Sequence, residues 1–247
     1  MRYAYSVATQ DERILTDSWT GDDRPPSLRL RLGEAAWFLP RILQTFGPTR
    51  PCGPEDGPPV LVIPGFIARD QTTTALRRAL AEAGWRVYGW ERGVNWGARA
   101  DTVAQLTRRL DEIGSDRPVL VVGWSLGGLF ARELARAVPD KVRAVITLGS
   151  PFSGDPKQNN VWKLYERVAG HKVDEPPLPR VTVKPPVPSL ALWSRKDGLI
   201  APRAARGLDN ERDEAVELDC THMAFGVSSK AARQVVREID RFLKKHG

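Results

Sequence analysis

The chain has 247 residues, of which 41% are hydrophobic and 27% charged, and its formal net charge is +7. This composition excludes a disordered chain, a collagen-like repeat and a multi-pass membrane protein, and the length suits one large domain with a full core. The two cysteines, Cys52 and Cys220, are too few for a disulfide framework, and no Cys/His spacing predicts a zinc site. We therefore expect a reducing compartment and no metal or other cofactor.

The first residues indicate where the protein resides. The start, Met1 to Ser6, lacks the unbroken apolar stretch of a signal peptide, and charges from Asp11 to Arg13 interrupt it early. No window approaches the roughly 18 apolar residues that a membrane-spanning helix requires. These features predict a cytoplasmic protein.

The positive net charge is compatible with a nucleic-acid partner, but the distribution of the basic residues along the chain argues against such a partner. Most arginines alternate with acids, as where Arg77 and Arg78 precede Glu82. No block of lysine and arginine, zinc finger or RNA-binding aromatic signature occurs. We therefore predict a solvated basic surface and no nucleic-acid partner.

Residues 1–57 are expected to form an N-terminal extension with one amphipathic helix. Apolar residues from Ser27 to Phe46 recur at nearly helical spacing, although Pro40 would kink or end such a helix. Basic residues would let residues 28–46 rest on a membrane surface. These are Arg29, Arg31 and Arg41. The alternative is a helix that packs on the domain or on a second subunit.

From residue 58 onward, short apolar runs alternate with helical patterns, which predicts an α/β domain with a mostly parallel sheet over residues 58–247. The expected strands are residues 59–63, 85–90, 118–122, 142–148, 189–193 and 215–218. The expected helices are residues 72–84, 101–113, 126–138 and 229–245. Proline-rich residues 151–188 break the alternation and contain one amphipathic segment, for which Asn160 is the expected N-cap.

The most informative motif is the G-x-S-x-G sequence from Gly123 to Gly127, which stands where an apolar strand ends and a helix begins. A serine on such a sharp turn adopts a strained conformation, so its neighbours need almost no side chain. The turn lifts the hydroxyl of Ser125 above the sheet at a helix N-terminus, where developing negative charge is favoured. This context predicts a serine nucleophile.

With three further motifs, this turn resembles the α/β-hydrolase family of serine esterases and lipases. The resemblance covers about residues 58–247 and rests on these motifs: Pro64-Gly65-Phe66, Gly123 to Gly128, Ser194 to Gly198 and Thr221-His222. It implies an α/β-hydrolase fold with helices on both faces of the sheet and a small cap formed by residues 151–188. It also implies a triad in the chain order nucleophile, acid, histidine.

Three histidines are candidates for the general base of this triad. His246 is one residue from the chain end, and His171 precedes the strand that should supply the acid. His222 follows the expected strand 215–218 and precedes the last helix, where the family places its base. We therefore assign the base to His222.

The acid expected from the same order is Asp197, which follows strand 189–193 and precedes Gly198. It would orient His222 and stabilise its imidazolium, although an Asp-Gly pair is also a common turn. Asp219 is the competing acid, but its closeness to His222 in sequence disfavours a good hydrogen bond. Cys220 is interpreted as a buried small thiol.

An oxyanion hole needs two backbone N–H groups aimed at the developing alkoxide. Leu126, directly after the nucleophile, supplies one of them. By family resemblance Phe66 supplies the other, in a loop where Pro64-Gly65 replaces the frequent His-Gly pair.

The leading functional interpretation is a carboxylic ester hydrolase that acts on a small-molecule ester. Trp162 and Tyr165 are expected to cover an apolar acyl pocket, and Trp124 is a further expected substrate-binding residue. The alternative is that the helical face that carries Trp162 and Tyr165, together with Val161 and Leu164, simply packs on the core. An acyltransferase or thioesterase would use the same triad. The other alternative is a non-catalytic, lipid-associated binding protein. The sequence leaves the oligomeric state open.

Overall fold

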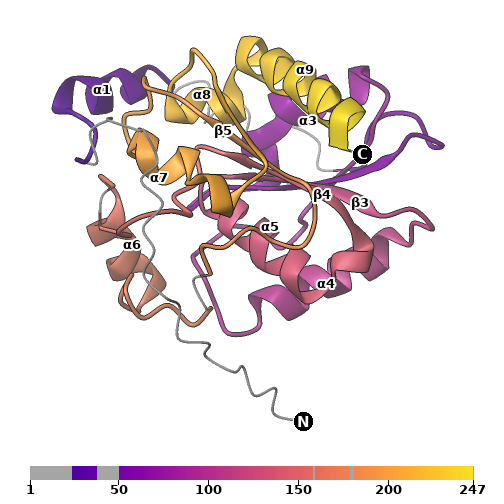
Figure 1. Ribbon diagram of the computed structural model, residues 1–247, viewed down its shortest axis with the longest axis horizontal. Coiled ribbons are helices and arrows are strands. Elements are labelled where there is room, and N and C mark those ends of the chain that lie inside the picture. The colour runs from indigo at the N-terminus through magenta and orange to yellow at the C-terminus, as the bar shows by residue number, and fades with distance from the viewer. Residues whose placement is uncertain (1–23, 38–49, 158, 179–180, 247) are drawn as a thin grey trace.

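The computed structural model describes residues 24–37, 50–157, 159–178 and 181–246. Within these residues, a sheet of six parallel strands has helices on both faces (Figure 1). The strands are β1 (Pro59–Ile63), β2 (Arg86–Gly89), β3 (Val119–Trp124), β4 (Val142–Leu148), β5 (Ser189–Trp193) and β6 (Glu214–Glu217). The predicted α/β architecture is confirmed.

The order of the strands determines where a site can form. The order is β2-β1-β3-β4-β5-β6, so the chain runs outward from β1 to β2 and then returns to the other side of β1. In open parallel sheets, ligands bind at the carboxyl ends of the strands where the order reverses in this way. The segments that follow β1 and β3 meet at this point, and they carry Phe66 and Ser125.

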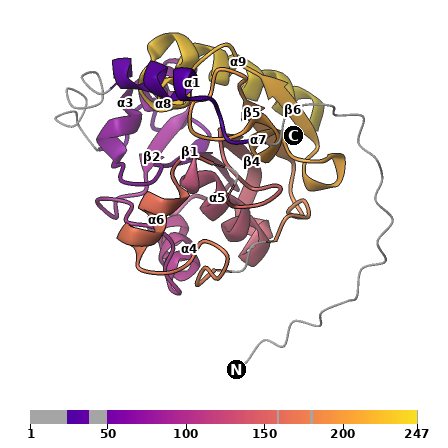
Figure 2. The ribbon, with the colours of Figure 1, turned by 90° about the vertical axis from the view of Figure 1, so that its left-hand side faces the viewer.

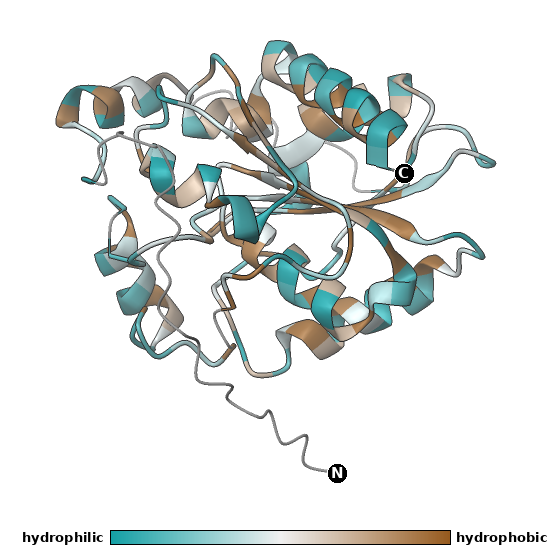
Figure 3. Cartoon of the chain, viewed as in Figure 1, coloured by the Kyte–Doolittle hydropathy of each residue, from teal (hydrophilic) through white to brown (hydrophobic). Residues whose placement is uncertain are grey.

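Helices α3 (Thr74–Glu82), α8 (His222–Val227) and α9 (Ser229–His246) cover one face of the sheet, and α4 (Thr102–Ile113) and α5 (Leu126–Ala137) cover the other. The central strands β1, β3 and β5 are buried along their whole length because each side meets a helical layer. In β1, Val60 and Val62 pack in the first layer, whereas Leu61 and Ile63 pack in the second. Figure 3 shows the resulting pattern, with brown strands at the centre and teal outer helix surfaces.

Several short elements lie outside these layers. They are α1 (Leu28–Gly33), η1 (Glu34–Trp37), η2 (Asp70–Thr73), η3 (Pro139–Lys141), α6 (Trp162–Ala169), α7 (Pro202–Arg206) and η4 (Asp209–Glu211). Of these, α1, α6 and α7 gather beyond the carboxyl ends of the strands (Figures 1 and 2). They surround the end of the sheet where the site is expected.

The predicted strands at 59–63, 142–148 and 189–193 agree with the structure at both ends. The expected helix at 72–84 begins as the 3-10 turn η2, which continues into α3. Short apolar helix α8 was not predicted, because the segment between β6 and α9 has too few residues to show a helical period.

The expected N-cap of the helix within residues 160–169 is wrong. Helix α6 begins at Trp162 and its N-cap position is Val161, because the Asn160 side chain instead donates hydrogen bonds to the carbonyl oxygens of Pro26 and Gly198, at 2.8 and 3.0 Å. Leu164 is 48% exposed, so the helix buries a narrower stripe than the sequence pattern indicates.

The predicted N-terminal helix also differs. Its described part is α1 and η1, and residues 38–49, which include Pro40 and Arg41, lie outside the described residues. Leu28 and Leu32 are 69% and 65% exposed, whereas Glu34 is 4% exposed. The segment α1–η1 therefore buries the carboxylate of Glu34 rather than these two leucines, because three backbone N–H groups of the domain donate hydrogen bonds to that carboxylate. Among the described helices, none has the length and apolarity needed to cross a membrane.

Candidate active site

Ser125 occupies the turn between β3 and α5 with a φ of 54°. A residue other than glycine in this region costs on the order of 1–3 kcal/mol, so the surrounding structure must hold it there. Its N–H donates to the Leu148 carbonyl at 2.8 Å. A Cβ on Gly123 would lie 2.3 Å from the Gly127 carbonyl oxygen, and one on Gly127 would lie 2.3 Å from that of Ile63. Both glycines are therefore required by backbone contacts around the serine.

His222 and Asp197 form a buried pair at the neighbouring strand ends. The distance from His222 Nδ1 to Asp197 Oδ2 is 2.7 Å. The other oxygen of Asp197, Oδ1, accepts from the N–H groups of Leu199 and Ile200, at 2.8 and 2.7 Å. These two bonds fix the orientation of the carboxyl group and point Oδ2 at the imidazole. The pair is thus arranged to fix one tautomer of His222.

Two contacts connect this pair to the serine turn. The first runs through Leu148, whose carbonyl accepts the Ser125 N–H and which directly precedes Gly149. A Cβ on Gly149 would lie 2.9 Å from Asp197 Oδ2 and 3.1 Å from His222 Nδ1, so this backbone lies against the pair. In addition, the indole Nε1 of Trp124 donates to the His222 carbonyl at 3.1 Å. The structure therefore brings the three predicted triad residues to one end of the sheet.

The competing acid and bases lie elsewhere. Asp219 is exposed and pairs with Lys196 Nζ at 2.5 Å, and this hydrogen bond lowers the pKa of its carboxyl. His171 contacts the hydroxyl of Tyr165 through Nε2, at 3.3 Å. His246 Nε2 lies 2.9 Å from Glu214, far along α9. Burial raises the pKa of Cys220 to about 12, so its thiol is protonated and unreactive near neutral pH.

The loop after β1 lies directly against the nucleophile. A Cβ on Gly65 would stand 3.1 Å from the Cβ of Ser125, so only glycine permits this approach without displacement. Phe66, the expected oxyanion donor, follows in the same loop, and Leu126, the other donor, opens α5. Buried Asn95 holds the loop, because its side-chain Nδ2 donates to the Pro64 carbonyl at 2.9 Å and its backbone carbonyl accepts from the N–H of Ile67 at 2.8 Å.

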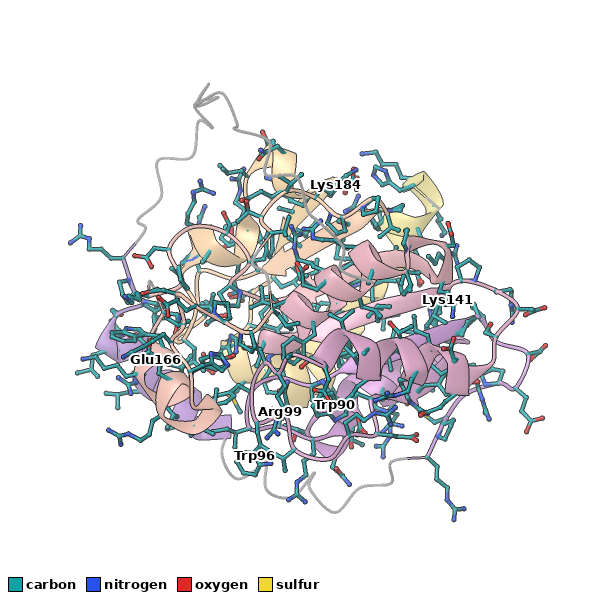
Figure 4. All side chains as sticks on the ribbon, turned by 90° about the horizontal axis from the view of Figure 1, so that it is seen from below. Trp90, Trp96, Arg99, Lys141, Glu166 and Lys184 are labelled. Atoms are coloured by element: carbon teal, nitrogen blue, oxygen red, sulfur yellow. The ribbon has the colours of Figure 1, made fainter. Side chains whose placement is uncertain are left out.

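An apolar pocket opens beside Ser125. Its walls include Phe66, Leu129, Phe130, Phe152, Trp162 and Tyr165. The hydroxyl of Tyr165 accepts from the N–H of Ala98 at 3.1 Å, and its ring lies 5.1 Å from that of Phe66. The side chain of Tyr165 therefore both packs on the loop after β2 and borders the pocket. Figure 4 labels Glu166 on α6 and Arg99 in that neighbouring loop.

Trp124 takes a position different from the one expected for a substrate-binding residue. Its ring is buried in the core cluster, 5.8 Å from the His222 ring, and it is not part of the pocket wall. Its polar N–H has a partner in the His222 carbonyl, which explains why so large an indole stands behind the serine turn.

Two residues that the sequence did not single out hold the site together. Asn95 lacks a motif, and only its burial and its bonds to the loop after β1 reveal its role. Glu34 is a buried carboxylate that reaches the segments of Asp197 and His222 from the N-terminal region. The described residues contain no group of three or more His, Cys, Asp or Glu side chains that could hold a metal ion.

Comparisons with known proteins agree with this architecture. Residues 58–172 match the family model described as alpha/beta hydrolase fold. No curated protein matches the chain.

Solved structures with the same fold are distant in sequence. A bacterial membrane phospholipase A is 16% identical with a TM-score of 0.61, over 87% of this chain and 97% of that one. Carboxylesterase CesB from Bacillus subtilis is 14% identical with a TM-score of 0.58, over 87% and 99%. The thioesterase domain from the curacin biosynthetic pathway is 16% identical with a TM-score of 0.55, over 76% and 93%. The family match over residues 58–172 and the sheet topology together show that this chain has the α/β-hydrolase fold.

Proposed function

We propose that this protein is a serine hydrolase that cleaves carboxylic esters with an apolar acyl or alkyl group. The fold supports ester hydrolysis in general, since esterases, a phospholipase and a thioesterase share it. The observation that best supports the proposal is the buried Asp197–His222 pair, at 2.7 Å, beside a serine held at a φ of 54°.

In the proposed acylation step, Ser125 Oγ attacks the carbonyl carbon of the ester and His222 takes the serine proton through Nε2. Asp197 accepts the Nδ1–H bond and stabilises the imidazolium that forms. The alkoxide is stabilised by the N–H groups of Leu126 and Phe66. His222 then returns the proton to the leaving alcohol, which leaves an acyl group on Ser125.

Deacylation uses the same groups. A water molecule enters where the alcohol left, His222 removes its proton, and the resulting attack on the acyl carbon again places negative charge on the oxyanion donors. Collapse of this second tetrahedral intermediate releases the carboxylic acid and regenerates Ser125. Every step uses side chains and backbone groups of this chain alone.

The apolar pocket supports the substrate class. Its walls are mostly aromatic and aliphatic, with Arg132, Glu133 and Asn159 as the charged or amide side chains among them, and burial of hydrocarbon there is favourable by about 25 cal/mol per Å². Trp162 and Tyr165, which belong to the segment proposed as a cap, line this pocket together with Ser125.

The proposal is tested by hydrolysis of p-nitrophenyl esters from acetate to palmitate. We expect turnover of at least one chain length, and a loss in kcat of about four to six orders of magnitude in a folded Ser125→Ala variant. A Ser125→Ala variant that keeps a tenth of the activity in a clean preparation would refute the assignment.

The same residues would support acyl transfer or thioester hydrolysis if another acceptor or substrate were used. Adding a primary alcohol to the ester assay distinguishes transfer, because a transferase forms the new ester faster than the free acid. Replacing the oxygen ester with the matching thioester tests the thioesterase alternative.

Contact with a membrane surface is a separate proposal for residues 28–46. It is supported by exposed Leu28 and Leu32 on α1, interleaved with exposed Arg29 and Arg31. Co-sedimentation with vesicles that contain anionic lipid, compared between the parent chain and a Leu28→Gln, Leu32→Gln variant, tests it. Equal sedimentation of the two proteins would reject this surface.

A further inference from the structure

Glu34 lies 164 residues before the Asp197 loop, yet its carboxylate is buried against it. Oε1 accepts from the N–H of Gly198 at 2.9 Å and from the N–H of His222 at 2.7 Å. Oε2 accepts from the N–H of Met223 at 2.9 Å. One carboxylate thus joins the residue after the proposed acid to the proposed base itself.

The bonds to His222 and Met223 replace a normal helix cap. These residues are the first two of α8, whose N–H groups have no partners inside the helix. The N-cap residue, Thr221, makes no side-chain cap bond, and its buried Oγ1 has no hydrogen-bond partner within the part of the chain that the structure describes. Glu34 therefore caps α8 from a distant part of the chain, and its negative charge faces the positive end of the helix.

The backbone of α1 is also seated on the acid loop. A Cβ on Gly198 would lie 2.4 Å from the Leu30 carbonyl oxygen and 2.8 Å from the N of Arg31. The side chain of Asn160 donates to the carbonyls of both Pro26 and Gly198, so the α6 region joins the same contact. Glycine at 198 is thus required by the close approach of the N-terminal segment.

We propose that Glu34 is a positioning residue for the triad, through which the N-terminal segment α1–η1 holds the Asp197 loop and His222 in their reactive arrangement. The inference rests on the proposed ester hydrolysis for its kinetic consequences, but its structural part concerns the His222–Asp197 hydrogen bond alone. With Glu34 bonded to the N–H of His222 and Trp124 bonded to its carbonyl, both backbone polar groups of the base are fixed by side chains from elsewhere.

Two effects follow from the loss of this carboxylate. In Glu34→Gln an amide NH2 group replaces one of the two acceptor oxygens, so at least one of the three buried N–H groups loses its acceptor, which loosens the contact between α8 and the Asp197 loop. The negative charge near the imidazole also disappears, and such a charge favours the imidazolium. Among the described residues, Asp197 from the β5 loop faces the imidazole at 2.7 Å, and the neighbouring segment of His222 also carries Cys220 and Asp219, the latter paired with Lys196.

The test compares Glu34→Gln, which keeps the size and removes the charge, with Glu34→Asp, which keeps the charge and shortens the reach. Glu82→Gln, which makes the same change at an exposed position on α3, is the matched control. For Glu34→Gln we expect kcat to fall about 10–100-fold with KM changed less, and for Glu34→Asp a smaller fall. The acid limb of the kcat/KM profile should move to lower pH in Glu34→Gln only, by less than about one unit.

A measurement without substrate separates this inference from the proposed function. The proton between His222 Nδ1 and Asp197 gives a far-downfield NMR resonance, and we expect it to shift or broaden in Glu34→Gln but to stay unchanged in Glu82→Gln. If the parent chain hydrolyses no ester, the proposed function fails and this resonance still tests the positioning role. If Glu34→Gln does not fold, Glu34→Asp is judged by the same readouts.

A purely structural role predicts a different pattern. The proposal would be overturned if folded Glu34→Gln and Glu34→Asp had a lower melting temperature but kept the native kcat, the native pH profile and an unchanged downfield resonance. Lower kcat with an altered resonance, and a partial return of both in Glu34→Asp, would support it.

Discussion

The indole N–H of Trp124 donates to the backbone carbonyl of His222 across 3.1 Å, and the two rings lie 5.8 Å apart. Because Trp124 directly precedes Ser125, this bond ties the serine turn to the segment of the proposed base. A Cβ on Gly226, one turn further along α8, would lie 3.0 Å from the Trp124 ring, so the indole also fixes the distance of α8 from β3. Trp124 therefore supports the site from the core of the domain and not from the wall of the apolar pocket.

We predict that Trp124→Phe keeps most of the apolar contact but leaves the His222 carbonyl without this donor. The expected cost is about 1–3 kcal/mol in the free energy of unfolding, together with a lower kcat at similar KM. Urea denaturation and ester kinetics measure the two effects. Trp96→Phe is the control, because Trp96 is half exposed at the surface labelled in Figure 4. Equal stability and kcat in the two variants would contradict the role given to this bond.

The loop after β1 offers a second prediction. Asn95→Ala removes the donor to the Pro64 carbonyl, so the loop that carries Phe66 loses a buried support. We expect kcat to fall about 10–100-fold, since a displaced oxyanion donor stabilises the transition state less. Asn210→Ala, at an exposed position, should leave kcat unchanged. An Asn95→Ala variant with native kcat would show that the loop holds its shape without this side chain.

Two substitutions on α6 separate pocket from surface. Trp162 borders the apolar pocket, whereas Leu164 on the same helix is largely exposed. Trp162→Ala should change kcat/KM by about 1–3 kcal/mol more for one ester chain length than for another, and Leu164→Ala should not. The kcat/KM values of both variants, measured across the p-nitrophenyl ester series, show whether Trp162 contacts the acyl chain. A uniform loss for every ester in Trp162→Ala, with a lower melting temperature, would mean that Trp162 only supports the fold.

Glu214 gives a prediction about pH and stability. Hydrogen bonds from Lys245, Arg241 and His246 lower the pKa of this carboxyl from 4.5 to about 2 and tie the end of α9 to β6. A carboxyl with a lowered folded-state pKa contributes stability above its ordinary pKa, and this contribution is lost as the pH falls from about 4.5 toward 2.

Glu214→Gln should therefore lower stability by up to about 1 kcal/mol at neutral pH, and the difference from the parent chain should vanish toward pH 2. Denaturant unfolding across this pH range measures it. Glu82→Gln, at an exposed position on α3, should show no such pH-dependent difference. A Glu214→Gln difference that persists at low pH would point to packing rather than charge.

The sequence predicted the sheet and the serine turn well because local patterns determine them. Five-residue apolar runs mark β1 and β5, since a strand buried on both faces needs no polar alternation. The glycines around Ser125 were predicted from the geometry of a tight turn, and the structure supplies the backbone contacts that require them. The family order of nucleophile, acid and histidine then pointed to Asp197 and His222, which the structure brings together.

The remaining features depend on contacts between distant segments. Glu34 sits in a stretch that reads as an amphipathic helix, and its burial is decided by three N–H groups more than 160 residues away. Asn160 looked like a helix cap, but its amide is used by two carbonyls from other segments. Trp124 was assigned to substrate binding because it adjoins the nucleophile, and only the position of α8 shows why it faces inward. No local pattern records such long-range partners.

The most direct test of the account is covalent labelling with a serine-directed organophosphonate, read by mass spectrometry and by loss of ester hydrolysis. We predict one label per chain, on Ser125, with Ser125→Ala unlabelled and His222→Ala labelled far more slowly. Asp197→Asn should react at an intermediate rate, because the base remains but its tautomer is no longer fixed. His171→Ala, with its histidine outside the triad, should react like the parent chain. Labelling on another residue, or a His171→Ala variant that is inert while His222→Ala reacts normally, would contradict the assignment.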